Sequence, residues 1–141
     1  MIIPGIRINT IEIPVEKLDR ATEWYRDVLG IACVWSDISH ALLDGMISTS
    51  EAFAIGIRVL LVETRDVSRL VFSNSKTKVI HSVIDFQTED IDIFHKYLKS
   101  KNVNVDVLGL PGNDWAPRGF GFFDSEGNRL GAYSYSSNQE N

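Results

Sequence analysis

The sequence predicts an α+β fold built from two βαβββ modules. A strand, a short turn and an amphipathic helix occupy residues 9–30, and a second strand–helix stretch follows in the other half of the chain. A shift of 73 residues aligns the two patterns, pairing Leu18 with Ile91 and Glu12 with Asp85. Such a repeat indicates one supersecondary unit used twice. Each unit is expected to carry its helix on one face of a sheet and to leave the other face open.

The first module is expected to span residues 5–66. In its first strand Ile11 and Ile13 alternate with polar neighbours, which is the period of a half-buried strand. The helix is predicted from apolar residues recurring on one face, and Gly30 suits a left-handed C′ position that closes it. The predicted elements are a helix at 18–29 and strands at 5–13, 31–35, 40–43 and 57–62.

The second module is expected to span residues 79–135, after a polar linker at 67–78. Its helix begins near Asp90, and Asn102 is the expected C′ residue. The last two strands are joined by a hairpin loop in which Gly127 supplies a positive φ. The predicted strands lie at 79–87, 103–108, 118–123 and 129–135.

Composition excludes several classes of protein. A chain of 141 residues is the size of one ordinary domain. Its net charge of −5 and pI near 5.1 argue against nucleic-acid binding, which requires a basic surface. No apolar run is long enough to span a membrane, and the first residues lack a signal peptide's charged start, so we expect a cytoplasmic protein. The lone Cys33 excludes an internal disulfide and a thiolate zinc cluster; we expect it in the core.

These patterns resemble the vicinal oxygen chelate superfamily, which contains glyoxalases, bleomycin-resistance proteins and extradiol dioxygenases. The resemblance rests on Ile13-Pro-Val-Glu-Lys-Leu-Asp-Arg-Ala, on Trp24-Tyr25, and on the hairpin Phe122-Phe-Asp124-Ser-Glu-Gly127-Asn. It covers nearly the whole chain. It implies that residues 1–141 form a single glyoxalase-like domain, a curved eight-stranded half-barrel around a ligand cavity, within a homodimer.

The resemblance also implies where a metal would bind. Metal-dependent members place His, Gln or Glu ligands at inward strand positions, which correspond here to Thr10, Leu60, Val83 and Gly131. None of the four carries an imidazole or a carboxylate, the groups that a divalent cation needs. We therefore expect no cofactor, and a protein that binds or sequesters a small organic molecule rather than an enzyme.

Two alternatives remain open. Glu12, His81 and Asp85 share strand parity with the expected ligand positions and offer a rebuilt site for a metal-dependent lyase, isomerase or dioxygenase. Such a site would move each ligand by one same-face position along its strand, a distance of about 6.6–6.8 Å. Without a metal, Glu12 and Asp85 are the candidates for a general acid–base pair. The other alternative is a structural or regulatory module whose cavity is filled by its own side chains.

A small-molecule partner would be held by the cavity's strand positions together with aromatic and cationic side chains. Trp115 stands out because it lies in a predicted loop, and arginine can bind a ligand carboxylate or phosphate in bidentate fashion. Arg129 matches Arg58 in the repeat, and Arg118 lies at a strand start. The expected ligand-binding residues are Thr10, Glu12, Arg58, Leu60, His81, Val83, Trp115, Gly131 and Tyr133.

Overall fold

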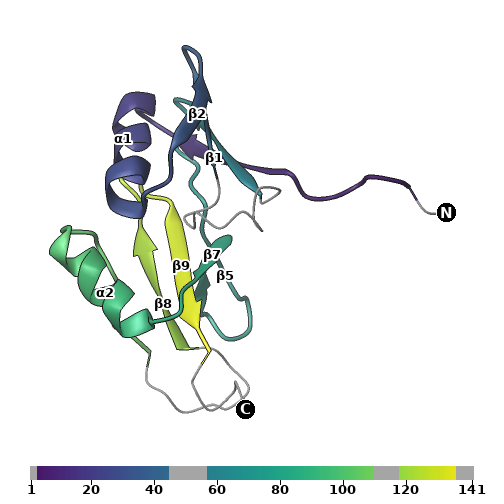
Figure 1. Ribbon diagram of the computed structural model, residues 1–141. Helices are drawn as coiled ribbons and strands as arrows, with labels where there is room; N and C mark the ends of the chain where they lie inside the picture. Colours follow the sequence, from purple (N-terminus) through teal and green to yellow (C-terminus); the bar gives the residue numbers. More distant parts are fainter. Residues whose placement is uncertain (1–2, 45–56, 110–117, 136–141) are drawn as a thin grey trace. The chain divides into compact units, whose positions relative to one another are not determined.

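The computed structural model describes residues 3–44, 57–109 and 118–135. The chain divides into two compact units, Met1–Ser68 and Arg69–Asn141, each with its own sheet and helix (Figure 1). This confirms the predicted α+β class. Within the described ranges, no helix has the length and apolar character that crossing a membrane requires.

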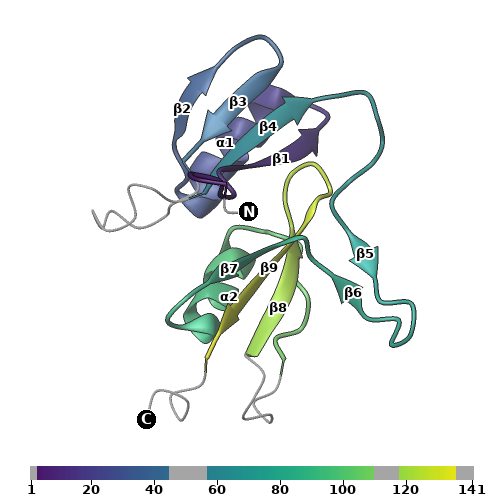
Figure 2. The ribbon, with the colours of Figure 1, turned by 90° about the vertical axis from the view of Figure 1, so that its right-hand side faces the viewer.

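The first unit has βαβββ topology. Its elements are β1 (Thr10–Val15), α1 (Leu18–Leu29), β2 (Cys33–Ser36), β3 (His40–Leu43) and β4 (Arg58–Glu63). The four strands lie in the order β1-β4-β3-β2, with β1 parallel to β4 and the other pairs antiparallel. Figure 2 shows α1 behind this sheet, so one sheet face carries the helix and the opposite face does not.

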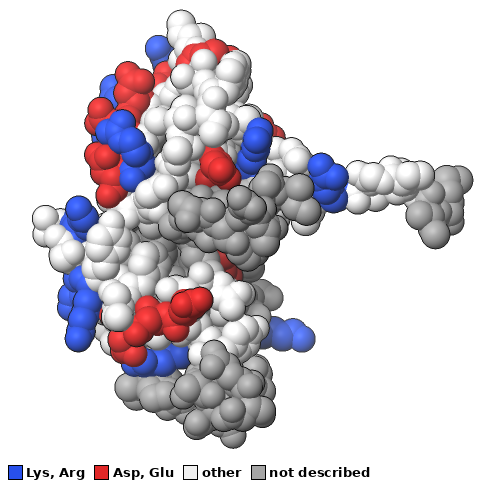
Figure 3. Space-filling view, in the orientation of Figure 1, with Lys and Arg blue, Asp and Glu red and all other residues white. Residues whose placement is uncertain are grey.

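The helix α1 has the bounds that its periodicity predicts. Its buried residues are Leu18, Ala21, Tyr25, Val28 and Leu29, which form the predicted apolar face. Acidic and basic side chains intermingle over its outer surface (Figure 3). Gly30 adopts φ 70°, the left-handed conformation expected of a glycine that ends a helix.

The second unit repeats this topology. Its elements are β5 (Phe72–Ser73), β6 (Ile80–His81), β7 (Ile84–Gln87), α2 (Ile91–Ser100), β8 (Arg118–Phe123) and β9 (Arg129–Ser134). The main sheet has the order β7-β9-β8, with β7 parallel to β9. An isolated bridge from Val105 to Phe122 supplies the position that β2 holds in the first unit. Asn102 has φ 60° and Gly127 φ 91°, as predicted.

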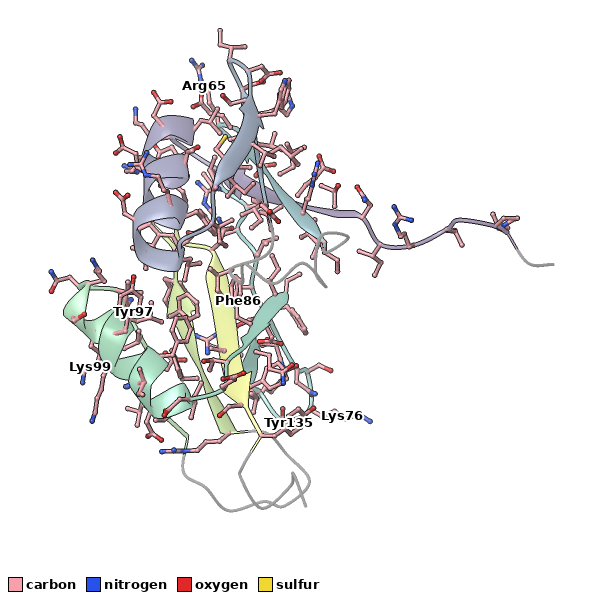
Figure 4. The ribbon with its side chains drawn as sticks, viewed as in Figure 1. Arg65, Lys76, Phe86, Tyr97, Lys99 and Tyr135 are labelled. Atoms are coloured by element: carbon pink, nitrogen blue, oxygen red, sulfur yellow. The ribbon has the colours of Figure 1, made fainter. Side chains whose placement is uncertain are left out.

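Aromatic rings fill the space between α2 and its sheet. Phe94 on α2 packs edge-on against Phe122 at 5.9 Å between ring centroids, and Phe86 of β7 lies 6.3 Å from Phe122. Figure 4 shows Phe86 in the body of the unit and Lys99 pointing away from α2. The even-numbered residues of β8 and β9 therefore face the helix, and the odd-numbered residues face the opposite side.

Three predicted strands differ from the observed ones. The first begins at residue 10 rather than 5, because its ladder with β4 begins at Thr10 and Arg58. The stretch 79–87 divides into β6 and β7 at a bend. In 103–108 only Val105 forms a bridge. The backbone bonds of that segment to β8 join residue 106 to 121 and 109 to 119, so an extra residue interrupts the ladder.

Part of the predicted linker at 67–78 forms a strand. Phe72 and Ser73 form β5, which pairs with β6 in a two-stranded hairpin of the second unit. The unit boundary at Ser68 falls inside the predicted 67–78 range. The polar run SNSKTK, whose composition predicts a linker, leads from β5 into the turn of this hairpin.

The expectation that Cys33 is a core residue is wrong. Cys33 is exposed, and its Sγ contacts the Trp35 carbonyl at 3.2 Å. The reason is the position of its strand, since β2 lies at the edge of the sheet and all four of its residues are exposed. Apolar density alone cannot distinguish an edge strand from a central one.

A carboxylate caps the N-terminus of each helix, but the two carboxylates come from different places in the chain. Lys17 occupies the N-cap of α1, and its side chain makes no capping hydrogen bond to the helix. Instead the backbone N–H of Leu18 donates to Glu63 Oε2, on β4, at 2.9 Å. At the equivalent position before α2, Asp90 accepts from the Ile93 N–H through its own side chain. Both carboxylates satisfy helix N–H groups and complement the helix dipole.

We predict that Glu63→Ala lowers the free energy of unfolding by about 1 kcal/mol, since it removes a cap acceptor. Glu63→Gln retains an acceptor oxygen and is expected to lose less. Urea unfolding followed by circular dichroism measures both, with the exposed Glu89→Ala as control. Equal losses in Glu63→Ala and Glu89→Ala would show that the Leu18 N–H does not depend on Glu63.

A buried polar network holds the β8–β9 hairpin to the start of the second unit. Asp124 Oδ1 accepts from the backbone N–H groups of Glu126 and Asn128, both at 2.8 Å. Asn128 is fully buried; its Nδ2 donates to Asp124 Oδ2 and its Oδ1 accepts from the Leu70 N–H, each at 2.9 Å. This network fixes residues 69–70 onto the second sheet.

We predict that Asn128→Ala costs about 2–4 kcal/mol of stability, because it removes the acceptor of the Leu70 N–H and a buried donor to Asp124 Oδ2. The exposed Asn104→Ala is the matched control and is expected to be nearly neutral. Thermal and urea unfolding give the two differences. A loss below 1 kcal/mol in Asn128→Ala would contradict a structural role for the network.

Candidate functional site

The helix-free face of the first sheet carries a mostly apolar row. Register places Glu12 of β1 beside Leu60 of β4, Leu60 beside Leu42 of β3, and Leu42 beside Trp35 of β2. Leu60 and Leu42 are half-buried, while Glu12 is exposed and Trp35 is 53% exposed. Such apolar side chains on an open sheet face are available to contact a ligand.

The same row in the second sheet has a different chemistry. Asp85 of β7 lies beside Gly131 of β9, and Gly131 lies beside Gly121 of β8. The backbone of Asp106 bonds to Gly121 and completes the row. By register, Asp85 is equivalent to Glu12, in agreement with the 73-residue shift, and Gly131 is equivalent to Leu60.

The pKa of Asp85, an acid of this row, is raised by its surroundings. A β-carbon at position 131 would overlap Asp85 Oδ1, and Ser82 Oγ would lie 3.2 Å from it. The Asp85 carboxyl therefore lies against the backbone of Gly131. Although the residue as a whole is exposed, this local burial raises the pKa of Asp85, against the opposing effect of the charges on His81 and Arg129.

The other predicted site residues are distributed over both units. Thr10 pairs with Arg58 in the first sheet, two residues along the strands from Glu12 and Leu60 and therefore on the same face. His81 stacks on Phe72 with 5.3 Å between ring centroids, and Val83 is exposed at the bend after β6. Tyr133 is half-buried on the odd face of β9. Trp115 lies outside the described residues.

Among the arginines considered for ligand binding, Arg118 and Arg129 form ion pairs. Arg118 Nη1 contacts both carboxylate oxygens of Asp92, at 2.9 and 3.1 Å. Arg129, the equivalent of Arg58, donates from Nη2 to Asp106 Oδ2. Sequence reasoning missed Asp106, because its position in the row depends on an irregular long-range contact with β8. It also missed Leu42 and Gly121, which only the register of the third strand identifies.

The residues at the positions that the resemblance assigns to metal ligands do not fit a metal. Thr10, Leu60 and Val83 offer no imidazole or carboxylate, and the space beside the Gly131 backbone is occupied by Asp85. Of the rebuilt set, His81 and Asp85 interact electrostatically in the second unit, while Glu12 belongs to the first. Over the described ranges, no three His, Cys, Asp or Glu side chains are grouped to hold a metal ion.

A shallow cleft of about 270 Å³ lies in the first unit, between α1 and the end of β2. Its acidic lining includes Asp19, Glu23 and Asp37. The Ser39 N–H and the His40 side chain bond to Asp37 and lower its pKa. None of the residues predicted to bind a ligand lines this cleft.

Known proteins with this fold vary in what they bind. The chain has a TM-score of 0.66 and 17% identity to TnmS3, an antibiotic binding protein from Streptomyces sp. CB03234, over 95% of this chain and 99% of that one. For lactoylglutathione lyase from Agrobacterium tumefaciens the values are 0.61 and 17%, over 93% and 95%. For fosfomycin resistance protein FosX from Listeria monocytogenes, solved with Mn(II) and a dihydroxypropylphosphonic acid, they are 0.66 and 14%, over 98% and 95%.

At these identities the structural matches show the fold alone. The comparison with curated proteins finds no relative. The family assignment comes from the sequence model of the glyoxalase/bleomycin resistance protein/dioxygenase superfamily, which matches residues 7–131. It agrees with the duplicated βαβββ topology and with the Asp124–Asn128 hairpin. The chain belongs to the glyoxalase/bleomycin resistance protein/dioxygenase superfamily.

Proposed function

We propose that this protein binds a small organic molecule on a helix-free sheet face, without a metal. The observation that carries the proposal is the row Glu12, Leu60, Leu42 and Trp35. In this row Leu60 occupies a position that the resemblance assigns to a metal ligand, and Leu42 and Trp35 add apolar surface beside it. An apolar row of this kind favours an aromatic or aliphatic ligand, because burial of its surface is the main source of affinity.

The residues of the second sheet support the same proposal. Gly131 offers no side-chain donor to a metal, and a side chain introduced there would displace the Asp85 carboxyl. The polar groups that remain, among them Asp85 and Arg129, are suited to hydrogen bonding with a ligand rather than to a convergent coordination shell. Thr10, Arg58, His81 and Tyr133 complete the set of described side chains that we assign to ligand contact.

The proposal also includes the activity, the oligomeric state and the cellular location of the protein. Binding rather than catalysis is the expected activity, the acting form is a homodimer, and the location is the cytoplasm. An antibiotic binding protein is among the proteins with this fold, which supports ligand binding as an activity that the fold can perform. Metal-dependent catalysis through Glu12, His81 and Asp85 is the competing proposal, favoured by the electrostatic interaction of His81 with Asp85.

We predict that the neutral aromatic probe N-phenyl-1-naphthylamine binds this protein in the presence of a chelator. Leu60→Gln should weaken binding by about tenfold, since it removes roughly 1–2 kcal/mol of apolar contact. Fluorescence titration gives both dissociation constants.

The matched control is Ile38→Gln, which alters an exposed apolar residue outside the row and should bind as the unmodified protein does. Circular dichroism checks that both variants are folded. Equal weakening in the two variants would place the probe elsewhere. Binding that appears only after a divalent metal is added would favour the competing proposal.

A further inference from the structure

The β5–β6 hairpin forms a two-stranded sheet of its own within the second unit. Its turn points away from the β7-β9-β8 sheet (Figure 2). The base of the hairpin is fixed, because the Leu70 N–H donates to Asn128 Oδ1 and the Leu70 carbonyl accepts from the Arg129 N–H. A two-stranded hairpin is marginally stable in water by itself, and it is stabilised when a further strand or another apolar surface covers it.

Both faces of this hairpin expose apolar side chains. Because Phe72 pairs with His81, Phe72 and Val79 lie on the same face. Val71 and Ile80 lie on the opposite face. These four apolar side chains are between 47% and 54% exposed. Single exposed apolar residues are ordinary, but a group of neighbouring ones is typical of an interaction surface.

The edges of the hairpin are available for pairing as well. The Asn74 N–H donates to the Val79 carbonyl, so the next pair along the ladder, Ser73 and Ile80, directs its backbone groups outward. Within the described ranges, neither Ser73 nor Ile80 has a backbone hydrogen bond to a segment outside the hairpin. An edge of this kind is a template for another strand.

The charges of the hairpin favour a second copy of this chain as that partner. Lys76 and Lys78 lie in the turn, and Figure 4 shows Lys76 pointing away from the unit. No acidic residue occurs between Asp66 and Asp85, which flank the hairpin at its base. The net charge of −5 disfavours an anionic membrane or a nucleic acid as the partner.

A two-fold axis turns this charge distribution into an attraction. If two copies of the hairpin pair in antiparallel orientation, their turns lie at opposite ends, so the lysines of the two copies do not meet. Each lysine-bearing turn lies instead toward the base of the other hairpin, where Asp66 and Asp85 lie. A tip-to-tip arrangement would bring like charges together.

We propose that the β5–β6 hairpin pairs with the same hairpin of a second copy of this chain, antiparallel and across a two-fold axis. The exposed apolar side chains then become cross-strand neighbours, and the outward backbone groups of one edge gain partners. The interface belongs to the homodimer of the proposed function, on which this inference rests.

Sedimentation equilibrium of the full chain measures the dimer dissociation constant. The double variant Val79→Thr, Ile80→Thr keeps β-branched residues in the strand but replaces apolar contacts. It is expected to raise the dissociation constant at least about tenfold. The matched control Ile38→Thr, Val107→Thr makes the same kind of change at two exposed residues outside the hairpin and should dimerise as the unmodified protein does. Circular dichroism checks that both variants are folded.

The charge contribution is measured separately. Dimerisation of the unmodified protein should weaken when NaCl is raised from about 50 to about 500 mM, because salt screens exposed charges. Lys76→Gln, Lys78→Gln should weaken the dimer at least about threefold at low salt and remove most of the salt dependence. Lys96→Gln, Lys99→Gln, at exposed positions of α2, is the control and should change neither quantity.

An unchanged dissociation constant in Val79→Thr, Ile80→Thr would overturn the inference and leave the homodimer standing. A monomer at every concentration would overturn both, while ligand binding is still tested by the naphthylamine titration. A disulfide between copies formed by Ser75→Cys, in a Cys33→Ser background, would show that the turns meet and would contradict the antiparallel orientation. A monomer that sediments with phosphatidylserine vesicles, and loses this in the Lys76, Lys78 variant, would assign the hairpin to a membrane surface instead.

Discussion

The parallel pairing of the first and last strands of each module is the constraint on which the rest of the structure depends. It aligns Glu12 with Leu60 in the first sheet and Asp85 with Gly131 in the second. Because side chains alternate across a strand, this register decides which residues lie under a helix and which lie on the open face. A slip of one residue would bury the acids and expose the core, so the chemistry of the open faces and the stability of the modules are set by the same pairing.

The two sheets share a topology, but their helix-free faces differ in chemistry. In the first sheet the row beside the acid is filled by Leu60, Leu42 and Trp35, which offer apolar surface. In the second sheet the positions equivalent to Leu60 and Leu42 are Gly131 and Gly121, and the space is taken by the side chains of Asp85 and Arg129. Duplication therefore preserved the backbone while the side chains diverged. This divergence is the physical basis for proposing an organic ligand rather than a metal-dependent reaction.

The sequence predicts local features well and long-range ones poorly. The bounds of α1, the left-handed Gly30 and the hairpin glycine follow from interactions within a few residues, and so could be predicted. The equivalence of Leu60 and Gly131 was found through the repeat. The exposure of Cys33 depends on β2 being an edge strand, and the role of Asp106 depends on pairing with distant β8. Neither order of pairing is encoded in periodicity, which reports only the local alternation of polar and apolar residues.

The measurement that tests the account most directly is a calorimetric titration of Mn²⁺, Ni²⁺ and Zn²⁺ into the chelator-treated full-length protein. We predict no saturable site for any of the three ions, because neither the positions assigned to metal ligands nor the Asp85 row supplies a convergent set of ligands. Stoichiometric binding of one ion per chain, lost in both Glu12→Ala and Asp85→Ala, would contradict it.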